Sequence, residues 1–530
     1  MTSSLALLTG STTRRRPTSW VLVPAIVVTL CMLIPVVYLF VRAAQADVAE
    51  ALDLILRQRN LDLLRNTLAL TFGVLAFTTL MALPMAWLVT RTDLRWRRIV
   101  TVLAVVPLAV PGYVMAYALL GIGGNYGALA RLFNIYISNI HGYWGAVAAL
   151  SLYTYPYIFL NVRSALLGLD SDLEESARSL GYGRLAIARH ILLPHLTPAL
   201  LAGYLVVGLY VLGDFGAVAL MRYEAFSYAI FNQYSGAFDR IYAAWLSIML
   251  LALAMSFVFM EVLLVKRRRL NSVGSGSQRP APRAKLGKLA PLAWLYVTVV
   301  VLLSVGLPVA MLSYWLLLSP PDLSVFQQVP MTFLRSASAA LPAAVLAAAM
   351  ALPICYLSIR HPSRLSRFME RTVYIGYALP PLTLALAMVF FALHTAFFLY
   401  QTLALLIFSW ALATLALATG PIRSALIQSR PNLEEAANAL GYSPAATFFH
   451  VLLPRLKQGI LAAIALVFLF CMKELPITFL LAPTGFNTLA VTVFSRTSEG
   501  MMAEAAPFAA AIVLFSRLSV GMILHREKNL

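Results

Sequence analysis

The stretch LEESARSLGYGRLAIARHILLP, residues 173–194, recurs 260 residues later as LEEAANALGYSPAATFFHVLLP, residues 433–454. The similarity extends upstream, because segments 163–166 and 423–426 both read RSAL and segments 82–84 and 351–353 both read ALP. The last pair has an offset of 269, so loop lengths differ slightly between the copies. Self-similarity at a nearly fixed offset indicates a duplicated structural unit. The sequence therefore predicts two homologous halves.

Apolar residues fill most of both halves. The chain of 530 residues is 61% hydrophobic and only 12% charged, whereas soluble domains are roughly half apolar and a quarter charged. The apolar residues form runs of about 20, the length of a helix that crosses a bilayer. Backbone groups in lipid must bond within their own segment, which favours helices. We predict an all-α membrane protein with about twelve spans, at residues 20–43, 63–89, 99–120, 142–162, 199–220, 241–265, 291–318, 336–359, 372–396, 398–420, 458–481 and 503–524.

The net charge of +19 reflects topology. Most of the 40 Lys and Arg residues lie in alternate connections between the predicted spans. This asymmetry is typical of cytoplasmic loops, so we expect both termini in the cytoplasm and no nucleic-acid partner. The apolar run at residues 20–40 is longer than a signal-peptide core, which favours an uncleaved first helix.

The predicted domains follow the duplication. Residues 1–265 form the first six-span half, 266–290 a basic and Gly/Ser-rich cytoplasmic linker, and 291–530 the second half. Because six is even, both halves enter the membrane in the same orientation. We therefore expect a pseudo-two-fold axis along the membrane normal instead of an inverted repeat.

The motifs of catalysis and of cofactor binding are missing from the sequence. The three Cys residues are isolated within spans, and no CxxC pair or Cys/His cluster occurs. The GxxxxGK[ST] spacing of a phosphate-binding loop is absent too. We expect a chain that is not an enzyme, binds no cofactor and has no assigned metal site.

The loops at residues 163–198 and 421–457 are long and patterned alike. Asp172 precedes Glu175 by three residues, and Asn432 precedes Glu435 by three, a spacing typical of capping boxes. Gly181 should end the first short helix, because glycine accepts a left-handed turn at little steric cost. A second short helix should follow and end at a proline before the next span. Each half should thus carry a helix–turn–helix on the cytoplasmic surface.

These loops resemble the EAA loop of ABC importer permeases. The pattern Glu175-x-Ala177-x-x-x-Gly181, followed by Leu193-Pro194, matches that motif, with Ser176 in place of the middle alanine. The second copy matches it again. The resemblance implies a type I ABC importer-like permease in a bacterial inner membrane, whose two coupling helices bind two copies of a cytoplasmic ATPase that uses the ATP. The coupling residues it implies are Glu175, Ala177, Gly181, Leu193, Pro194, Glu435, Ala437, Gly441, Leu453 and Pro454.

Ionisable residues inside predicted spans indicate a possible translocation pathway. Asp214 and Glu474 occupy equivalent positions in the two halves, and Lys473 adjoins Glu474. These residues could line the pathway. Alternatively, the carboxylates could pair with Lys473, Arg65 or Arg335 and lock the helices together.

Segments near these residues resemble the ferric-iron permease branch. They are residues 213–233, 472–476 and 485–490. The resemblance implies a periplasmic ferric-binding protein as partner, docking on loops 121–141, 221–240 and 482–502. Carboxylate oxygens suit a hard cation, yet they would also suit an organic cation. Thiamine, polyamine and phosphonate permeases remain alternative ABC importers, and an ion-driven secondary transporter is the alternative of another class.

Overall fold

The computed structural model describes residues 19–45, 57–125, 127–169, 171–236, 239–266, 283–318 and 320–528. Within these ranges the regular structure is helical, and the β-type pairing is limited to an isolated bridge between Thr92 and Ala284. The prediction of an all-α protein is confirmed. Most of the predicted linker, residues 267–282, lies outside the described ranges.

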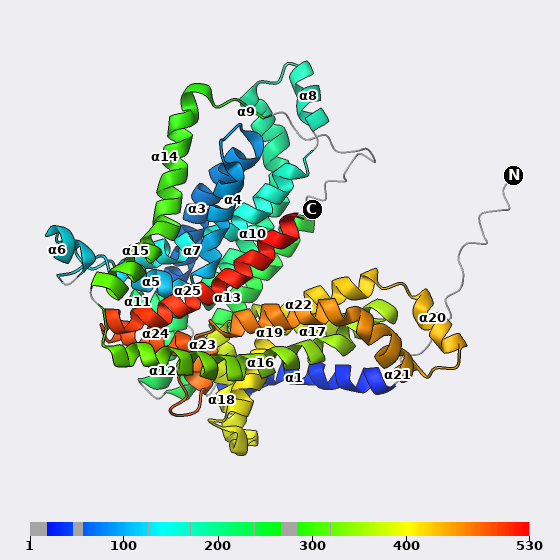
Figure 1. Ribbon diagram of the computed structural model, residues 1–530. Helices are drawn as coiled ribbons and strands as arrows, with labels where there is room; N and C mark the ends of the chain where they lie inside the picture. The colour runs from blue at the N-terminus through cyan, green and yellow to red at the C-terminus, as the bar shows by residue number, and fades with distance from the viewer. Residues whose placement is uncertain are drawn as a thin grey trace. The chain divides into compact units, whose positions relative to one another are not determined.

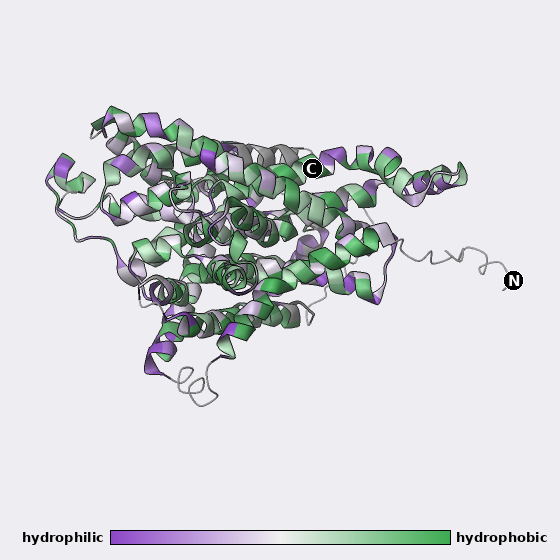
Figure 2. Ribbon diagram, turned by 90° about the horizontal axis from the view of Figure 1, so that it is seen from below, coloured by the Kyte–Doolittle hydropathy of each residue, from purple (hydrophilic) through white to green (hydrophobic). Residues whose placement is uncertain are grey.

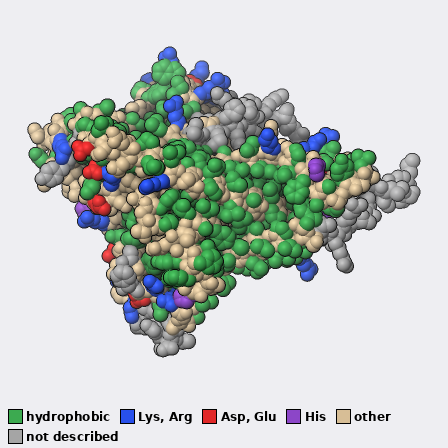
Figure 3. Space-filling view, turned by 60° about the horizontal axis from the view of Figure 1, so that its bottom comes forward, with side chains coloured by type: hydrophobic (Ala, Val, Ile, Leu, Met, Phe, Trp, Pro, Cys, Tyr) green, Lys and Arg blue, Asp and Glu red, His purple; other side chains and the backbone are tan. Residues whose placement is uncertain are grey.

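Nine helices in the described ranges are long and apolar enough to cross a membrane, and the number rises to eleven if each of two bent helix pairs counts as one span. The nine are Ser19–Ala43, Gln58–Arg91, Gly142–Leu167, Ala188–Gly213, Arg240–Glu261, Gly287–Leu318, Leu323–Arg360, Leu403–Gln428 and Pro444–Cys471. The predicted last span, 503–524, lies within α25 (Met502–Lys528). Hydrophobic residues dominate these helices, and hydrophilic residues concentrate at helix ends and connections (Figure 2). Hydrophobic side chains also form a broad field on the face drawn in Figure 3.

The spans predicted at 99–120 and 199–220 are not single helices. The first is divided into α4 (Arg97–Val105), the 3-10 turn Val106–Ala109 and α5 (Gly112–Leu120), with a bend of 92°. Pro107 and Pro111 lie at the break, and proline removes a backbone donor and disfavours a helical residue before it. The second is divided into α10 (Leu193–Gly213) and α11 (Gly216–Leu220).

The second half is broken at the equivalent places. The span predicted at 372–396 consists of α17 (Arg364–Ala378) and α18 (Pro381–Thr395), separated at Pro380. The span predicted at 458–481 consists of α22 (Leu453–Cys471) and α23 (Pro476–Leu481). The duplication therefore preserves the interruptions as well as the helices.

The fold separates into two compact units. The larger unit comprises residues 37–339, 378–406 and 472–530, and the smaller comprises 1–36, 340–377 and 407–471. In the larger unit α7 (Gly142–Leu167) packs between α3 (Gln58–Arg91) and α10, and α10 also contacts α13 (Arg240–Lys266) (Figure 1).

The smaller unit is joined by aromatic packing and close helix contacts. The ring of Trp20 in α1 (Ser19–Ala43) packs at a tilt against Tyr356 of α16 (Leu323–Arg360) and edge-on against Phe448. Gly459 of α22 packs closely against Ala425 of α19 (Leu403–Gln428).

Candidate coupling loops and translocation pathway

Each patterned loop begins with a short helix that ends in the same glycine turn. The helices are α8 (Ser171–Ser179) and α20 (Asn432–Ala439). Gly181 and Gly441 have φ angles of +84° and +88°. The amides of Tyr182 and Tyr442 donate to the carbonyls of Ala177 and Ala437, at 3.0 and 3.1 Å. This six-to-one bond closes the left-handed helix end typical of glycine.

The capping-box prediction is wrong for the second copy. The N-cap of α20 is Pro431, which makes no side-chain cap bond, and Asn432 is the first helical residue. In the first copy α8 begins at Ser171, so Asp172 also lies inside the first turn. The acidic residues of both first turns still favour the helix, because they lie near its positive end.

The coupling residues separate into buried and exposed sets. Ala177 and Ala437 are buried, whereas Glu175 and Glu435 are exposed. At the tip of each loop Leu180 and Leu440 are 77% and 80% exposed. A large apolar residue is therefore exposed at the same place in both copies.

The second short helix does not end at proline. The helices α9 (Arg184–Ile187) and α21 (Pro444–Thr447) continue through five-residue π-turns into the next spans, which begin at Leu193-Pro194 and Leu453-Pro454. Proline is compatible with the first turn of a helix, where its missing N–H has no intrahelical partner. Pro194 and Pro454 therefore lie just after a π-turn, in the first turn of α10 and α22.

A buried ion pair fixes α8 to the end of α3. Nη1 of Arg91 lies 2.9 Å from Oε1 of Glu174, and both side chains are almost fully buried. Nη2 of Arg91 also donates to the carbonyl of Leu166 at 3.0 Å, at the end of α7. One guanidinium thus joins three helices.

The second copy contains the same arrangement. Nε of Arg360 donates to Oε1 of Glu434 at 2.8 Å, and its Nη2 donates to the carbonyl of Ser429 at 2.8 Å. Tyr356 adds a hydroxyl bond of 3.3 Å to the same carboxylate. We call these two arrangements, Arg91–Glu174 and Arg360–Glu434, the arginine clamps.

Both clamps were missed in the sequence, although a signal for them was present. Glu174 and Glu434 differ by the loop offset of 260, and Arg91 and Arg360 by the upstream offset of 269. Both copies therefore keep one glutamate in the loop and one arginine at the end of an upstream span. A pair of opposite charges that recurs in this way indicates a contact between the two residues.

Asp214 and Glu474 both cap the short helix that follows a broken span. Oδ1 of Asp214 accepts the amides of Ala217 and Val218 in α11, at 2.9 and 3.4 Å. The two oxygens of Glu474 accept the amides of Ile477 and Thr478 in α23, at 2.7 and 3.0 Å. The carboxylates therefore stabilise an interrupted backbone, the local task of an N-cap residue.

Lys473 joins two of the breaks. Its Nζ donates to the carbonyl of Leu108 at 3.3 Å, within the interruption between α4 and α5. The hydroxyl of Tyr113 donates to the carbonyl of Lys473 at 3.2 Å. An ammonium group that bonds to a helix-break carbonyl satisfies an acceptor that a continuous helix would satisfy internally.

Close glycine contacts bring the breaks together in the larger unit. A Cβ on Gly112 would lie 3.0 Å from Oδ2 of Asp214, one on Gly216 would lie 2.8 Å from Leu475, and one on Gly213 would lie 2.9 Å from Pro381. Interrupted helices inside a membrane are tolerated where they are buried in protein or line a cavity. They are also typical of transporter substrate sites.

Four phenylalanine rings pack beside the breaks. Phe215 follows Asp214 directly, and its ring centroid lies 4.8 Å from that of Phe231 and 5.2 Å from that of Phe494. Phe479 contacts the other three, at 5.4 to 6.1 Å. The four rings form one apolar cluster, which begins at the residue that follows Asp214.

Within the described ranges no group of three or more His, Cys, Asp or Glu side chains is arranged to hold a metal ion. Asp214 and Glu474 already accept backbone donors.

Comparisons with known proteins account for the duplication. The family described as "Binding-protein-dependent transport system inner membrane component" matches residues 78–270 and again residues 340–526. The Fe(3+)-transport system permease protein FbpB 2 of Haemophilus influenzae is 31% identical over 517 residues, which cover 96% of this chain and 98% of that protein.

Other relatives match only part of the chain. The sulfate transport system permease protein CysT of Salmonella typhimurium is 30% identical over 36% of this chain and 69% of its own length. The molybdenum transport system permease protein ModB of Escherichia coli is 32% identical over 28% of this chain and 67% of its own length. The chain belongs to the family of inner-membrane components of binding-protein-dependent transport systems, and it carries that family's domain twice.

Proposed function

We propose that this permease imports ferric iron. The observation that carries the proposal is the match to the Fe(3+)-transport permease, which runs through both halves and nearly the full length of both chains. The sulfate and molybdenum relatives match less than half of this chain. Family membership argues against the alternative of an ion-driven secondary transporter. In this family ATP is hydrolysed by a separate ATPase subunit.

Partner assignments extend this proposal. A periplasmic ferric-binding protein delivers iron to loops 121–141, 221–240 and 482–502, and two ATPase copies bind the opposite face of the permease. Both termini lie on the ATPase side, as the distribution of basic residues predicts. The two halves, residues 1–265 and 291–530, act as the two arms of the transporter.

The patterned loops are the coupling elements. Leu180 and Leu440 supply exposed apolar contacts to the ATPase, with Glu175 and Glu435 beside them. The arginine clamps carry the movement of α8 and α20 to the ends of α3 and α16. Gly181 and Gly441 hold the turn that gives each loop its shape.

The pathway passes the convergence of broken spans at Asp214, Lys473 and Glu474. The phenylalanine cluster closes it, because an apolar constriction excludes water and ions. Opening separates the rings, and the carboxylates then offer oxygen atoms to a hard cation. Carboxylate charge favours a cationic substrate over sulfate or molybdate.

Uptake by proteoliposomes containing the permease, its ATPase and its binding protein tests the substrate. Radiolabelled ferric iron should accumulate with ATP, and labelled sulfate, molybdate and thiamine should not. Accumulation of one of these other substrates without iron would overturn the iron proposal and retain the importer. A matched preparation with a hydrolysis-deficient ATPase controls for leakage.

A further inference from the structure

A polar pocket opens between the first part of α16 and the helix α24 (Leu489–Ser498). Its volume is 370 Å³, which exceeds that of several water molecules at about 30 Å³ each. Most of its lining side chains are polar, and two of them are the arginines Arg335 and Arg496. None of the described lining residues carries a carboxylate. All of them belong to the larger unit.

Arg496 is already paired within the chain. Its Nη1 forms an ion pair with Glu504 of α25, and its Nη2 donates to Oε1 of Gln328 at 3.2 Å. The guanidinium also lies over the ring of Phe508, 5.2 Å from the ring centroid. Arg496 is therefore a fixed wall of the pocket, and its charge is compensated.

Arg335 is exposed and differs from Arg496 in its contacts. Within the described part of the chain its guanidinium forms no ion pair and no hydrogen bond. Asn487 lines the same cavity and is exposed too. The hydroxyls of Thr332 and Thr492 donate to carbonyls of their own helices, at 2.9 and 2.8 Å. Arg335 and Asn487 thus offer N–H donors to a group from outside, and a guanidinium suits the two oxygens of a carboxylate.

The pocket adjoins a junction that the duplicated chain contains twice. In the second half the amide of Leu489, the first residue of α24, donates to Oγ of Ser336 in α16 at 2.9 Å. In the first half the amide of Phe226, the first residue of α12 (Phe226–Ser235), donates to Oγ1 of Thr67 in α3 at 3.0 Å. The two bonds align the halves residue by residue at this place.

The first half fills the equivalent junction with a different pair of residues. Asn66 is the counterpart of Arg335, and Glu224 is the counterpart of Asn487. Nδ2 of Asn66 donates to the carbonyl of Glu224 at 3.0 Å, so this side-chain donor is used within the chain. The basic residue of the first half lies one position earlier, at Arg65. A guanidinium without a partner at this position is therefore a feature of the second half.

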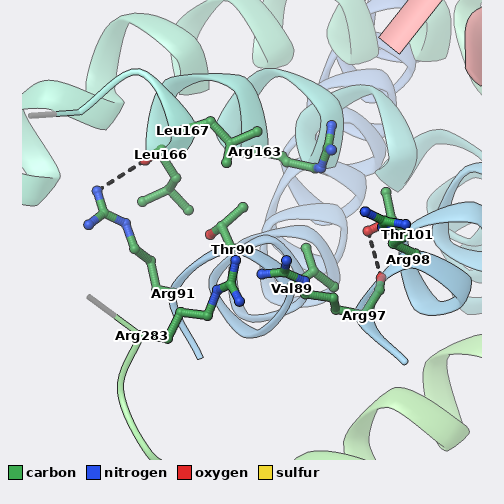
Figure 4. A pocket seen from close by; sticks show the side chains of 10 residues that line it. All are labelled: Val89, Thr90, Arg91, Arg97, Arg98, Thr101, Arg163, Leu166, Leu167 and Arg283. Carbon is green, nitrogen blue, oxygen red and sulfur yellow. Dashed lines mark hydrogen bonds between the residues drawn. The ribbon is translucent and has the colours of Figure 1, made fainter. Parts of the chain in front are cut away.

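The junctions and the coupling loops lie at opposite ends of a membrane-spanning helix. In α3, about 25 residues separate Asn66 from Arg91, which is about 37 Å at 1.5 Å per residue and exceeds a hydrocarbon layer of ~30 Å. Figure 4 draws the arginine-lined pocket at the Arg91 end, where Arg91 is paired with Glu174 and bonds to the carbonyl of Leu166. The junction end faces the other side, to which loop 482–502 belongs.

We propose that the pocket at Arg335 receives a carboxylate side chain of the periplasmic protein that delivers the substrate. The inference rests on the proposed function, in which that protein docks on this face. Arg335 binds both carboxylate oxygens, and Asn487 donates a further N–H bond. A protein side chain suits the site better than a free anion, because an exposed ion pair contributes little until a covering surface excludes water. The carboxylate fixes the orientation of the docked protein, since the first half has Glu224 in place of Asn487.

The test measures the affinity of the delivering protein for the full-length permease with its ATPase, held in lipid nanodiscs. Arg335→Glu should weaken binding about tenfold, the scale of one lost charge-assisted hydrogen bond. Asn487→Asp, which gives the pocket its own carboxylate, should weaken binding as well. The control is Arg371→Glu, at an exposed arginine of the predicted cytoplasmic connection 360–371, and it should bind as wild type. Wild-type affinity in both pocket variants, or an equal loss in the control, would overturn the site.

A charge swap identifies the partner group. Acidic residues of the delivering protein are changed to arginine one at a time, and one of these changes should weaken binding to the wild type and restore binding to Arg335→Glu. If none restores it, direct pairing is refuted. If Arg335→Glu instead raises the KM for uptake while the delivering protein binds with wild-type affinity, the pocket holds an anion of the cargo and the docking assignment fails.

The outcome for the pocket is separate from the outcome for iron. The delivering protein in this assay is the one that supports ATP-driven uptake by the permease, whatever substrate it carries. If that substrate is not iron, the iron proposal fails, whereas the pocket is still judged by the affinities of the variants. If iron is taken up and the affinities do not change, only the pocket assignment fails.

Discussion

Arg91 at the end of α3 and Glu174 in α8 form a buried ion pair of 2.9 Å, and the duplicated chain repeats it between Arg360 and Glu434 at 2.8 Å. The exposed neighbours Glu175 and Glu435 carry the EAA motif, yet the buried glutamates make the contact that holds each loop to its half. A short surface helix can move the membrane spans only if it is firmly attached to them. We propose that the arginine clamps are the polar contacts that provide this attachment.

Replacing Arg91 or Arg360 by leucine should leave a buried glutamate without its partner. Removing one member of a buried pair costs about 3–5 kcal/mol. We expect a lower melting temperature and a reduced ratio of transported substrate to hydrolysed ATP, measured in proteoliposomes. The double variant Arg91→Leu/Glu174→Leu removes both charges and should recover stability. If it also recovers full coupling, the clamp has only a stabilising role.

Valine at Gly181 or Gly441 should distort the coupling turn. Both glycines have φ near +85°, where an L-residue costs roughly 1–2 kcal/mol. No atom approaches within 4 Å of the added Cβ, so the effect is conformational. Transport should fall while membrane content is unchanged. Gly183→Ser is the control, because serine occupies the equivalent position 443. Wild-type transport in both valine variants would refute the coupling assignment.

Aspartate at Leu180 or Leu440 should weaken binding of the ATPase. These leucines are 77% and 80% exposed, so their loss leaves the core intact and removes an apolar contact with a partner. Co-purification of the ATPase measures the effect. Leu323→Asp, at another exposed leucine (72%), should leave complex formation unchanged. Normal co-purification with both loop variants would exclude these leucines from the interface.

The variants Asp214→Asn and Glu474→Gln test whether the negative charge of each side chain matters apart from its hydrogen bonds to a helix N-terminus. Asparagine at 214 keeps an oxygen that can accept both amides of α11, so its stability should change little. Glutamine at 474 keeps one of the two oxygens that accept amides of α23, so it should be somewhat less stable. If the carboxylates meet a cationic substrate, uptake should fall severalfold. Asp214→Ala, which also removes the cap, should cost about 1 kcal/mol of stability. Undiminished uptake in the two amide variants would assign both acids to capping alone.

Valine at Gly112 or Gly216 should clash with neighbouring residues where the broken spans pack together, and so hinder their movement. Added atoms would overlap Tyr153 and Asp214 in the first variant, and Leu475 and Tyr113 in the second. Overpacking costs about 1–3 kcal/mol, and we expect ATP-driven uptake to fall while the ATPase still binds. Gly420→Val, where nothing lies within 4 Å of the added Cβ, is the control. Equal uptake in all three variants would exclude this region from the moving pathway.

Sequence patterns predicted the helices and the duplication because apolar runs and repeated words are local signals. The interruptions at Pro107–Pro111 and Asp214–Phe215 were not predicted, since hydropathy averages across a break of a few residues. The clamps were missed for another reason: Arg91 and Glu174 are far apart in sequence, and only the recurrence of both residues in the second copy connects them. Proline at 194 and 454 was read as a helix end because the π-turn before it has no simple sequence signature.

That π-turn determines how far each patterned loop is rotated about the axis of the span that follows it. The amides of Leu193 and Leu453 bond five residues back, to Ala188 and Phe448. One additional residue in a helix turns everything beyond it by about 100°, because an α-helix has 3.6 residues per turn. The direction in which α8 and α20 face is therefore set by a residue count. The two copies keep the same count, so each short helix has the same rotational relation to the span that follows it in its own half.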